Sequence, residues 1–551
     1  MNLELRLVSS MNKVFLDEAP REDLPRQGMT CFGNECFSFQ AAWTNHDPEA
    51  RTMVRLEVRS PLGACVRVRR VYHMPVRFAA FPDSDDNYLR TTPGLYPDLL
   101  DEPQGDWIAW HGMWESAWID VEPEGTVAPG RYSIEVILVD QAGAEFARQG
   151  MALEILPGKL PPQTLIHTKW FYCDCLCHYY GVEMFSDAFY AIAERFICAA
   201  VKRGINMILT PIHTPSLDTA VGGERLTSQL VDIVLEDGHY RFGFEQLDRW
   251  VRMCLDAGVE YFEMEHLFSQ WGARHAPKII ATVNGEKKRI FGWETDAAGA
   301  EYRAFLREYL TALTAHLRAL GIADRCWFHI SDEPQLDQLE SYRAARDGVA
   351  ELLKGFPIID ALSDLEFYRT GLVPKPVAAS NHIRPFLEAG VPGLWTYYCV
   401  GQYKDMSNTF LAMPGARTRV LGTQLYKFHI EGFLQWGYNF YNTQYSHRSI
   451  DPHFITDGEA FGPAGDAFQV YPGPNGVPQE SIRMMLAAEA MQDLRALQYL
   501  EALAGREEAM RVLEEGLEAP IEFDRYPRDS AWLLKLRQRV NAAIMGYLRE
   551  R

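Results

Sequence analysis

The amino-acid sequence predicts an α/β fold in which a (β/α)8, TIM-like barrel follows an N-terminal β-sandwich. Three observations indicate it: apolar and charged residues alternate up to about residue 156, a Pro- and Gly-rich break follows, and strand-like and helix-like segments then repeat. A chain of 551 residues is also too long for one compact core. We therefore expect a sandwich domain at residues 1–156, a barrel domain at residues 163–475 and a helical segment at residues 476–551 packed on the barrel.

The N-terminal strands are predicted by a period of two. Apolar and charged residues alternate strictly at residues 54–59, and the same period recurs at residues 65–69 and 132–138. Such alternation is typical of strands with one buried face. A turn signal at residues 128–130 precedes the last of these strands. A region of this kind favours two packed sheets.

The barrel is predicted by strand and helix patterns that follow one another along the chain. The expected strands lie at residues 164–172, 205–209, 259–264, 325–330, 357–362, 393–399 and 432–440, and the expected helices at residues 187–203, 245–257, 302–320 and 336–353. Several of these helices stop at a glycine, such as Gly204, Gly258 and Gly321. Repeated units favour a (β/α)8 barrel. A doubly wound sheet is the competing topology, but the sequence has no Gly-rich dinucleotide-binding turn.

The composition narrows the class of partner and the compartment. The net charge is −20, and no Lys/Arg-rich block offsets it, so we expect no nucleic-acid partner. The first residues lack the apolar core of a signal peptide, and the chain has no 18-residue apolar run. We therefore expect a cytoplasmic protein with no membrane partner. Assembly into a homo-oligomer is compatible with the sequence.

Two groups of residues are candidates for metal binding. The Cys-x-Cys-x-Cys run at residues 173–177 has a spacing that fits a strand better than a zinc knuckle, and no second Cys-x-x-Cys pair accompanies it. Buried free thiols are the expectation there. His213, Glu265 and His266 lack the HExxH spacing of a zinc helix. We expect these histidines to bind hydroxyl groups or to be buried and hydrogen-bonded, and we expect no metal.

Polar and aromatic residues gather where the predicted strands end. In a barrel the carboxyl ends of the strands meet at one rim, which carries the functional site. The candidate residues there are Asp174, His213, Glu265, His266, Trp271, His329, Asp332, Glu333, Tyr397, Tyr398, Trp436 and Asn439. Aromatic faces stack on the C–H surfaces of sugars, while Asp, Asn and His side chains bind hydroxyl groups. The set therefore predicts a carbohydrate site.

The adjacent carboxylates Asp332 and Glu333 are the most specific feature of this rim. Neighbouring residues on a strand point to opposite faces, so both can face one cavity only if the strand has ended. Pro334 favours such an end, because it cannot continue a ladder and holds Glu333 extended. Two carboxyls this close cannot both ionise freely, and one would keep its proton near neutrality, as a general acid must. The alternative is a cap for the helix at residues 336–353, and spacing alone leaves both open.

Several separated motifs resemble a known family. They lie at residues 91–98 (TTPGLYPD), 209–215 (LTPIHTP), 217–219 (LDT), 266–272 (HLFSQWG), 328–334 (FHISDEP), 395–399 (WTYYC), 432–441 (GFLQWGYNFY), 465–468 (GDAF), 470–473 (VYPG) and 481–483 (SIR). The chain resembles the family known as domain of unknown function 4091, which is similar to the catalytic part of glycoside hydrolase family 123. The agreement is specific for the family and much less specific for the substrate.

The resemblance implies an exo-acting β-N-acetylgalactosaminidase that retains configuration without a nucleophile from the protein. In such an enzyme the sugar's own 2-acetamido oxygen attacks C1 and gives an oxazolinium-like intermediate. Carried over by position, Glu333 would be the acid that protonates the leaving oxygen and then the base that activates water. Asp332 would bind the acetamido N–H and stabilise its developing positive charge.

The resemblance also implies a tyrosine that donates to the acetamido carbonyl. We expect Tyr398 in this role, with Tyr397 as the next choice, and Trp436 and Trp271 as walls of the pocket. The expected substrate is a small carbohydrate or glycoconjugate with a β-linked 2-acetamido-2-deoxy sugar, GalNAc before GlcNAc. No cofactor is expected.

Two alternatives stay open. A glycosidase acting on a non-acetylated sugar would use Glu333 as the acid and a separate carboxylate nucleophile, from Glu265, Asp360 or Asp364. Adjacency argues against it, since a conventional retaining pair lies about 5–5.5 Å apart across the scissile bond and usually comes from different elements. In the second alternative the chain is a non-catalytic carbohydrate-binding protein.

Overall fold

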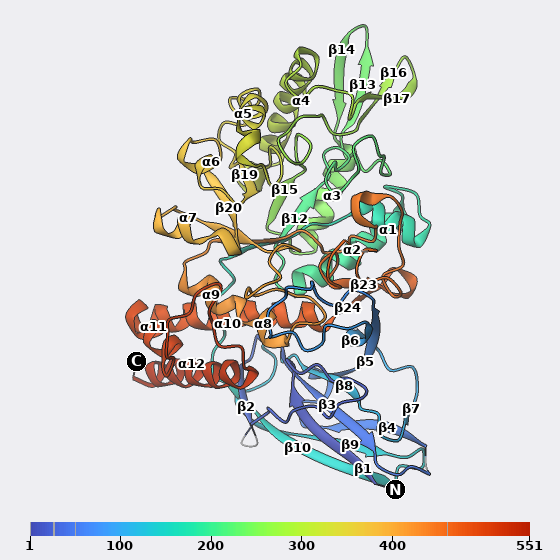
Figure 1. Ribbon diagram of the computed structural model, residues 1–551, viewed down its shortest axis with the longest axis vertical. Helices are drawn as coiled ribbons and strands as arrows, with labels where there is room; N and C mark the ends of the chain where they lie inside the picture. Colours follow the sequence, from blue (N-terminus) through green and yellow to red (C-terminus); the bar gives the residue numbers. More distant parts are fainter. Residues whose placement is uncertain (1, 26–27, 50, 460, 551) are drawn as a thin grey trace.

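Two five-stranded sheets form the N-terminal region of the computed structural model, which describes residues 2–25, 28–49, 51–459 and 461–550 (Figure 1). The first sheet has the order β1(Leu3–Ser9)-β3(Phe37–Asn45)-β8(Glu115–Val121)-β5(Val66–Val76)-β6(Gly94–Asp101). The second has the order β2(Met29–Phe32)-β10(Glu145–Leu156)-β9(Gly130–Val139)-β4(Thr52–Arg59)-β7(Trp107–Ala109). The alternation expected at residues 54–59 is visible at the start of β4, where buried Val54 lies between exposed Met53 and Arg55.

Eight short parallel strands form the central sheet. They are β11(Ile166–Lys169), β12(Met207–Thr210), β15(Tyr261–Met264), β18(Cys326–Phe328), β19(Ile359–Leu362), β20(Lys375–Ala379), β21(Trp395–Tyr397) and β22(Gly432–Gln435). Their order is β18-β15-β12-β11-β22-β21-β20-β19. At the two ends of this order, the Phe328 N–H donates to the Pro357 carbonyl (2.9 Å), and a single bridge joins Phe328 to Ile358. The sheet is therefore a nearly closed barrel with its seam between β18 and β19.

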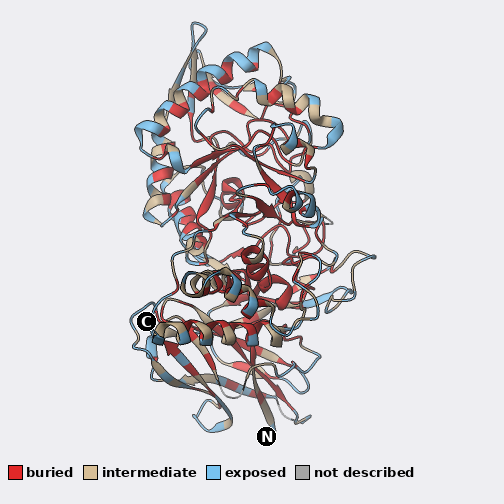
Figure 2. Cartoon of the chain, turned by 90° about the vertical axis from the view of Figure 1, so that its left-hand side faces the viewer, coloured by how far each residue is buried: buried red, intermediate tan, exposed pale blue. Residues whose placement is uncertain are grey.

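Helices follow the strands and surround this barrel. They are α1(Cys173–Tyr180), α2(Asp187–Lys202), α3(Glu245–Asp256), α4(Ala300–Ala319), α5(Leu339–Asp347), α6(Glu366–Arg369), α7(Arg384–Glu388), α8(Gly415–Arg419) and α9(Leu421–Lys427). Figure 2 shows buried strands inside and helices with exposed outer faces around them. Helix α2 illustrates the pattern: Ser186 caps its first turn by accepting from the Phe189 N–H, and Phe189 and Phe196 are buried.

Two small sheets are inserted in the loops of the barrel. One consists of β13(Asp232–Glu236), β14(His239–Gly243), β16(Ile279–Val283) and β17(Glu286–Phe291), and it stands at the end of the molecule farthest from the N-terminal sheets (Figure 1). The other is the pair β23(Val470–Pro472) and β24(Pro478–Glu480).

The C-terminal helices α10(Ile482–Ala504), α11(Arg506–Glu514) and α12(Ser530–Glu550) contact both halves of the chain. In α10, Arg483 forms a buried ion pair with Asp98 of β6 (2.8 Å). Glu489 of the same helix bonds Arg419 of α8 (2.6 Å) and the Ser10 hydroxyl (2.9 Å). These helices therefore pack against the N-terminal sheets as well as against the barrel. None of the described helices is long and apolar enough to cross a membrane.

Strand β20 was not among the predicted strands. Its sequence, Lys375–Ala379, contains a proline and two alanines, which are weak strand formers. Neighbouring strands β19 and β21 supply its hydrogen bonds, so its existence depends on tertiary pairing.

Two helical segments also differ from expectation. The cysteine run, expected to be a strand, forms α1, in which Cys173, Cys175 and Cys177 are buried free thiols. The strand prediction depended on the alternating spacing of the cysteines. Residues 173–177 are all buried, so this alternation does not separate a buried face from an exposed one. The helix expected at residues 336–353 is a 3-10 turn at Leu336–Gln338 followed by the short helix α5.

Candidate active site

A pocket opens at the carboxyl ends of the barrel strands. Asp332 and Glu333 follow β18, Tyr397 ends β21 and Trp436 follows β22 directly. The pocket has a volume of about 180 Å³. The residues that line it are Trp170, Asp218, Gln270, Trp271, Asp332, Glu333, Ala361, Tyr397, Cys399, Val400, Leu434, Trp436, Gln444, Tyr445 and Phe461.

Both adjacent carboxylates face this pocket because the strand has ended before them. Strand β18 stops at Phe328, and the Glu333 N–H crosses the seam to the Ala361 carbonyl of β19 (3.0 Å). Glu333 is not extended as expected: its φ is 44°, in the left-handed region. Its N–H bond to β19 fixes this conformation, which the restriction imposed by a following proline does not reveal.

The helix-cap alternative for the pair does not fit the structure. Gln335 is the residue that caps the following turn, through a reciprocal capping box with Gln338. Asp332 instead accepts from the Gln270 side-chain amide, with Nε2 3.0 Å from Oδ2. Its backbone carbonyl accepts from the Trp271 N–H (3.0 Å). The carboxylate of Asp332 is thus held toward the pocket by the loop after β15.

The two carboxyls are buried, and the pKa of each is raised. Burial raises the pKa of Asp332 well above its usual value, the Glu333 charge adds to the rise, and the Gln270 hydrogen bond opposes it. Burial also raises the pKa of Glu333, against the effect of the Tyr397 hydroxyl, which donates to Glu333 Oε1 (2.6 Å). The pair therefore titrates as a unit and retains a proton at a higher pH than isolated carboxyls do.

Strained backbone is concentrated around this pocket. Among the described non-glycine residues with positive φ, four line it: Asp218 (50°), Trp271 (53°), Glu333 (44°) and Tyr445 (57°). Such conformations persist only where surrounding contacts impose them, and they cluster at functional sites.

Aromatic side chains form the walls of the pocket. Trp436 stacks on Phe461 (5.0 Å between ring centroids) and donates its Nε1–H to Asp466 (2.9 Å). Trp271 is 42% exposed at the mouth and meets Tyr445 edge-on. Aromatic walls around paired carboxyls are suited to binding a sugar ring beside an acid.

A known protein family matches the part of the chain that carries this pocket. The family model described as glycoside hydrolase 123, catalytic domain, matches residues 170–500. The chain belongs to glycoside hydrolase family 123. It is therefore a glycoside hydrolase that acts on a carbohydrate substrate.

Solved structures show how far the likeness extends. A family 123 glycoside hydrolase from Clostridium perfringens, described for glycolipid glycan hydrolysis, has 14% identity and a TM-score of 0.75, covering 100% of this chain and 98% of that one. This likeness shows a shared fold. An endo-beta-1,4-mannanase from Thermotoga petrophila has 12% identity and a TM-score of 0.34, covering 61% of this chain and 78% of that one. The search of curated proteins found no match to the present chain.

Beneath the pocket of this glycoside hydrolase lies a buried network centred on His329. Its Nε2 lies 2.6 Å from Glu263 Oε1, and its Nδ1 lies 3.1 Å from Asp360 Oδ1. Burial alone would lower the pKa of His329, but the two carboxylates raise it to about 10. His329 therefore carries a positive charge, which in turn acts to lower the pKa of Asp332. It supports the site from below and does not line the pocket, where a hydroxyl-binding role was expected.

His329 also belongs to a candidate metal cluster. His266, His329 and Asp360 each offer a ligand atom, and these atoms lie within 4.8 Å of one another. Both ring nitrogens of His329 are already within bonding distance of carboxylates, and His266 stacks on its ring at 4.0 Å. His329 is therefore satisfied as a hydrogen-bonded imidazolium, whereas the buried Nε2 of His266 has no hydrogen-bond partner among the residues that the structure describes.

Tyr398, the first choice for a substrate-binding tyrosine, lies outside the pocket. It packs edge-on against Phe433, at 4.9 Å between ring centroids, while Tyr397 lines the pocket and reaches Glu333. Alternation at the end of β21 sends the two rings to opposite sides. Of the two candidates, Tyr397 is the one that lines the pocket.

Three further candidates are buried and do not line the pocket. Asp174 forms a buried bidentate pair with Arg225 (2.6 and 2.9 Å). His213 lies 2.7 Å from the His266 carbonyl, and Asn439 bonds both the N–H and the carbonyl of Tyr172. Each side chain thus bonds a buried partner, although Nδ1 of His213 has none among the described residues.

Glu265 and His266 are likewise buried beneath the pocket. The Glu265 carboxylate accepts from the His266 N–H (3.0 Å) and lies 3.2 Å from its ring. Burial raises the pKa of Glu265 to about 7. As alternative nucleophiles, Asp360 is bonded to His329, and Asp364 accepts from the Glu366 N–H of α6 (2.8 Å). None of the three expected nucleophiles lines the pocket.

Sequence reasoning missed Asp218, Gln270 and Tyr445, which all line the pocket from long loops. Asp218 stands in the LDT motif and Gln270 in the HLFSQWG motif, so both lay within segments that carried the family resemblance. Each of the three lies several residues beyond the end of the preceding strand, so a search for polar residues directly at the strand ends did not find it.

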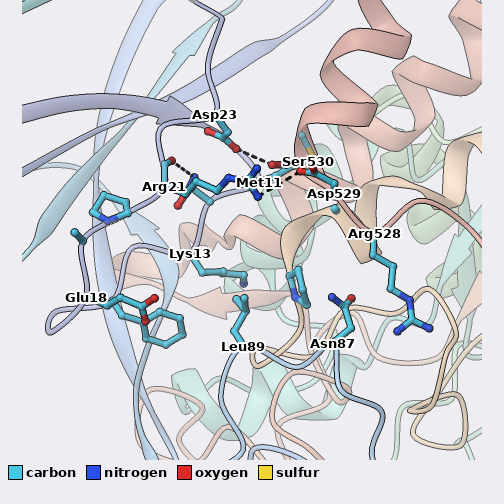
Figure 3. A pocket seen from close by; sticks show the side chains of 16 residues that line it. Met11, Lys13, Glu18, Arg21, Asp23, Asn87, Leu89, Arg528, Asp529 and Ser530 are labelled. Atoms are coloured by element: carbon cyan, nitrogen blue, oxygen red, sulfur yellow. Dashed lines mark hydrogen bonds and ion pairs between the residues drawn. The ribbon is translucent and has the colours of Figure 1, made fainter. Parts of the chain in front are cut away.

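A larger cleft of about 580 Å³ lies elsewhere, between the N-terminal segment and the start of α12 (Figure 3). Its acidic groups have partners: Asp23 accepts from Ser530 Oγ (2.9 Å), and Asp529 lies 3.7 Å from Arg21. None of its lining residues stands directly at the carboxyl end of a barrel strand, so the smaller pocket is the candidate active site.

Proposed function

We propose that this family 123 enzyme is a retaining exo-glycosidase that removes a terminal β-linked 2-acetamido-2-deoxy sugar, GalNAc before GlcNAc, with the acetamido group as the nucleophile. The adjacency of Asp332 and Glu333 in one aromatic-walled pocket is the observation that carries the proposal. A stabiliser beside an acid can serve one side of a sugar, whereas a nucleophile must face the acid across the scissile bond.

In the first step the acetamido oxygen attacks C1, the glycosidic C–O bond breaks, and Glu333 gives its proton to the leaving oxygen. This forms a cyclic oxazolinium and releases the aglycone. In the second step the Glu333 carboxylate takes a proton from water, whose oxygen bonds to C1. The oxazolinium ring opens and restores both the acetamido group and the configuration at C1.

Substrate binding would assign the proton that the pair shares. The acetamido N–H is a donor and needs an acceptor, so it favours the ionised form of Asp332. The Gln270 hydrogen bond and the charge of His329 act in the same direction. The proton is then left on Glu333, where the leaving oxygen requires it.

Tyr397 is the candidate donor to the acetamido carbonyl. In the free enzyme its hydroxyl donates to Glu333 Oε1, and it lines the pocket between the acid and the aromatic wall. A small rotation would allow it to donate to the carbonyl oxygen instead. Such a bond would orient the oxygen for attack on C1.

The size of the pocket supports exo action. Its volume of about 180 Å³ is below the range of about 300–1,000 Å³ that is usual for drug-sized ligands. One sugar unit fits such a volume, and the rest of the glycan would extend past Trp271. We also propose that the nearly closed barrel is a (β/α)8 barrel and that the two N-terminal sheets form a β-sandwich. The site would then lie on the loops that follow the barrel strands.

A panel of nitrophenyl glycosides, with and without the 2-acetamido group, tests the proposal together with a thiazoline inhibitor. We expect turnover of the β-linked acetamido sugars only, and strong inhibition by the thiazoline that mimics the oxazolinium. Turnover of a plain galactoside or glucoside, unaffected by the thiazoline, would instead indicate a carboxylate nucleophile. A Glu333→Gln variant that binds glycans as the wild type does, with no hydrolysis by either, would indicate a binding protein.

A further inference from the structure

Asp218 is a third carboxylate of the pocket. It lies on the loop after β12 and lines the same pocket as Asp332 and Glu333, and only 8% of its surface is exposed. Although nearly buried, it lines the pocket, so its side chain has a wall position in direct reach of a bound sugar.

The backbone of Asp218 is clamped on both sides. Its N–H donates to Gln270 Oε1 (2.7 Å), and its carbonyl accepts from Ser446 Oγ (2.7 Å). The same Gln270 donates to Asp332, so one amide spans the two carboxylate residues. A left-handed backbone at φ 50° completes this fixed geometry. The residue is therefore preorganised in a conformation that costs energy.

The side chain of Asp218, in contrast, has no hydrogen bond to any residue that the structure describes. Arg225, whose charge acts to lower the pKa of Asp218, is engaged in its bidentate pair with Asp174. A buried carboxylate without a donor is unfavourable, and native proteins rarely leave one so. The Asp218 oxygens are not among the fully buried atoms that lack a partner, so the pocket leaves them accessible to a donor from solvent or from a bound sugar.

The lining of the pocket has a single sign of charge. Asp218, Asp332 and Glu333 are its ionisable carboxylates, and the lining residues include no lysine, arginine or histidine among those that the structure describes. Hydroxyl and amide N–H groups of an uncharged sugar can donate to these carboxylates. Among the lining residues, a sulfate, phosphate or carboxylate on the sugar would meet only groups of like charge.

We propose that Asp218 is a substrate-binding residue whose carboxylate accepts hydrogen bonds from hydroxyl groups of the sugar bound at Asp332 and Glu333, and that the three acids together restrict the pocket to uncharged sugars. Sugars bearing sulfate, phosphate or carboxylate groups are excluded. The inference rests on the proposed function for the position of the sugar, and it adds the residue and the substrate class.

A nucleophilic role is the competing assignment for Asp218, because a conventional retaining mechanism needs a second carboxylate. A nucleophile must be ionised and must lie against C1. Burial and the Glu333 charge raise the pKa of Asp218 to about 7, against the effect of Arg225. Such a group is only partly ionised near neutrality in the free enzyme, which does not suit a nucleophile. A sugar hydroxyl that donates to Asp218 would favour the ionised form, as the acetamido N–H does for Asp332.

The test compares Asp218→Asn with the wild type and with Asp237→Asn. Asparagine tolerates the left-handed backbone, so the fold is preserved, and Asp237 is an exposed residue with a matching φ of 51°. The substrates are a nitrophenyl β-glycoside of the preferred 2-acetamido sugar, its singly deoxygenated analogues and its 6-O-sulfated form. Melting temperatures establish that all three proteins are folded.

We expect Asp218→Asn to lower kcat/KM by about 10- to 100-fold, mainly through KM, as loss of a hydrogen bond to a charged acceptor does. For the analogue that lacks the contacted hydroxyl, wild type and variant should agree within about threefold. The wild type should strongly prefer the unsulfated sugar, and the variant should narrow that preference. Asp237→Asn should behave as the wild type.

An unchanged kcat/KM in folded Asp218→Asn, or equal use of the sulfated sugar by the wild type, overturns the inference. A loss of kcat above about 1,000-fold without thiazoline inhibition would make Asp218 the nucleophile. If the wild type hydrolyses no acetamido glycoside, the proposed function fails separately. Calorimetric binding of free monosaccharides then decides for Asp218: weaker binding by the variant supports it, and equal binding refutes it.

Discussion

Replacing Asp332 with asparagine removes one charge from the pair and keeps its shape. Gln270 must donate to the single side-chain oxygen of the introduced asparagine, since it now donates to Asp332 Oδ2 at 3.0 Å. The amide NH2 of that asparagine would then point toward the acetamido N–H, and two donors would meet. The substitution therefore turns an attractive contact into a repulsive one at the group that attacks C1.

The magnitude follows from what is lost. A hydrogen bond to a charged acceptor contributes about 1.5–3 kcal/mol. Stabilisation of a developing charge in a water-poor pocket is comparable to that of an oxyanion-hole donor, whose removal costs about 2.7–4 kcal/mol. We therefore expect kcat to fall by about 100- to 1,000-fold.

The same variant should also shift the pH dependence. The charge of Asp332 and that of Glu333 repel each other, so neutralising position 332 lowers the pKa of Glu333. Because Glu333 acts first as an acid, the alkaline limb of kcat/KM should move to lower pH.

Stability should move in the opposite direction to activity. A carboxyl whose folded pKa is raised favours the folded state when protonated, and this advantage is lost as pH rises through the folded pKa from about 3.9, the unfolded value. The asparagine in Asp332→Asn does not ionise, so the variant does not lose stability in this way as the pH rises. The variant should therefore melt at or above the wild-type temperature at pH 8, with a smaller gain at pH 4.5.

Stopped assays with a nitrophenyl acetamido glycoside across pH, together with scanning calorimetry, measure these quantities. Asp337→Asn, an exposed substitution in the next turn, is the matched control and should leave both unchanged. A decrease in kcat below tenfold with Asp332→Asn would falsify the role of Asp332 in orienting the acetamido group.

Three further substitutions test other parts of the site. Tyr397→Phe removes the donor to Glu333 Oε1, so the pKa of Glu333 should rise and the alkaline limb of kcat/KM should move to higher pH. We expect kcat to fall by about tenfold. An alkaline limb at unchanged pH would mean that Tyr397 does not influence the ionisation of Glu333. Gln270→Ala should lower kcat/KM by about 10- to 100-fold with little change in melting temperature, and a purely structural role would give the reverse pattern. Asp174→Asn leaves Arg225 without its buried partner and should reduce the free energy of unfolding in urea by about 3–5 kcal/mol, whereas a direct sugar contact would appear in KM at unchanged stability.

The periodic elements of the fold were predictable from the sequence. Helix α2, expected at residues 187–203, is found at Asp187–Lys202, and α3, expected at 245–257, is found at Glu245–Asp256. Their apolar faces and their stop signals are local properties of the chain. Strand β20 was missed because its pairing partners are distant in sequence and its residues carry no strand preference of their own.

Several candidate residues could be located at strand ends from the sequence, but the direction of their side chains could not. Histidines and carboxylates that follow strands were all counted at one rim, yet His329, Glu265 and His266 turn into the barrel and lie in its buried polar network. The direction of a side chain at a strand end depends on where the strand stops, to within one residue. Periodicity does not give that position, since element boundaries are its least certain product.

By itself the sequence determined that an acid pair follows a strand and is flanked by aromatic residues at other strand ends. The tertiary structure decided which residues join that pair: it selected Tyr397 over Tyr398 and brought in Gln270 and Asp218 from long loops. Local patterns fix elements, because helices and strands are formed by neighbours in the chain. A pocket is formed by loops that meet in space, and the closure of the barrel, which no local pattern records, brings them together.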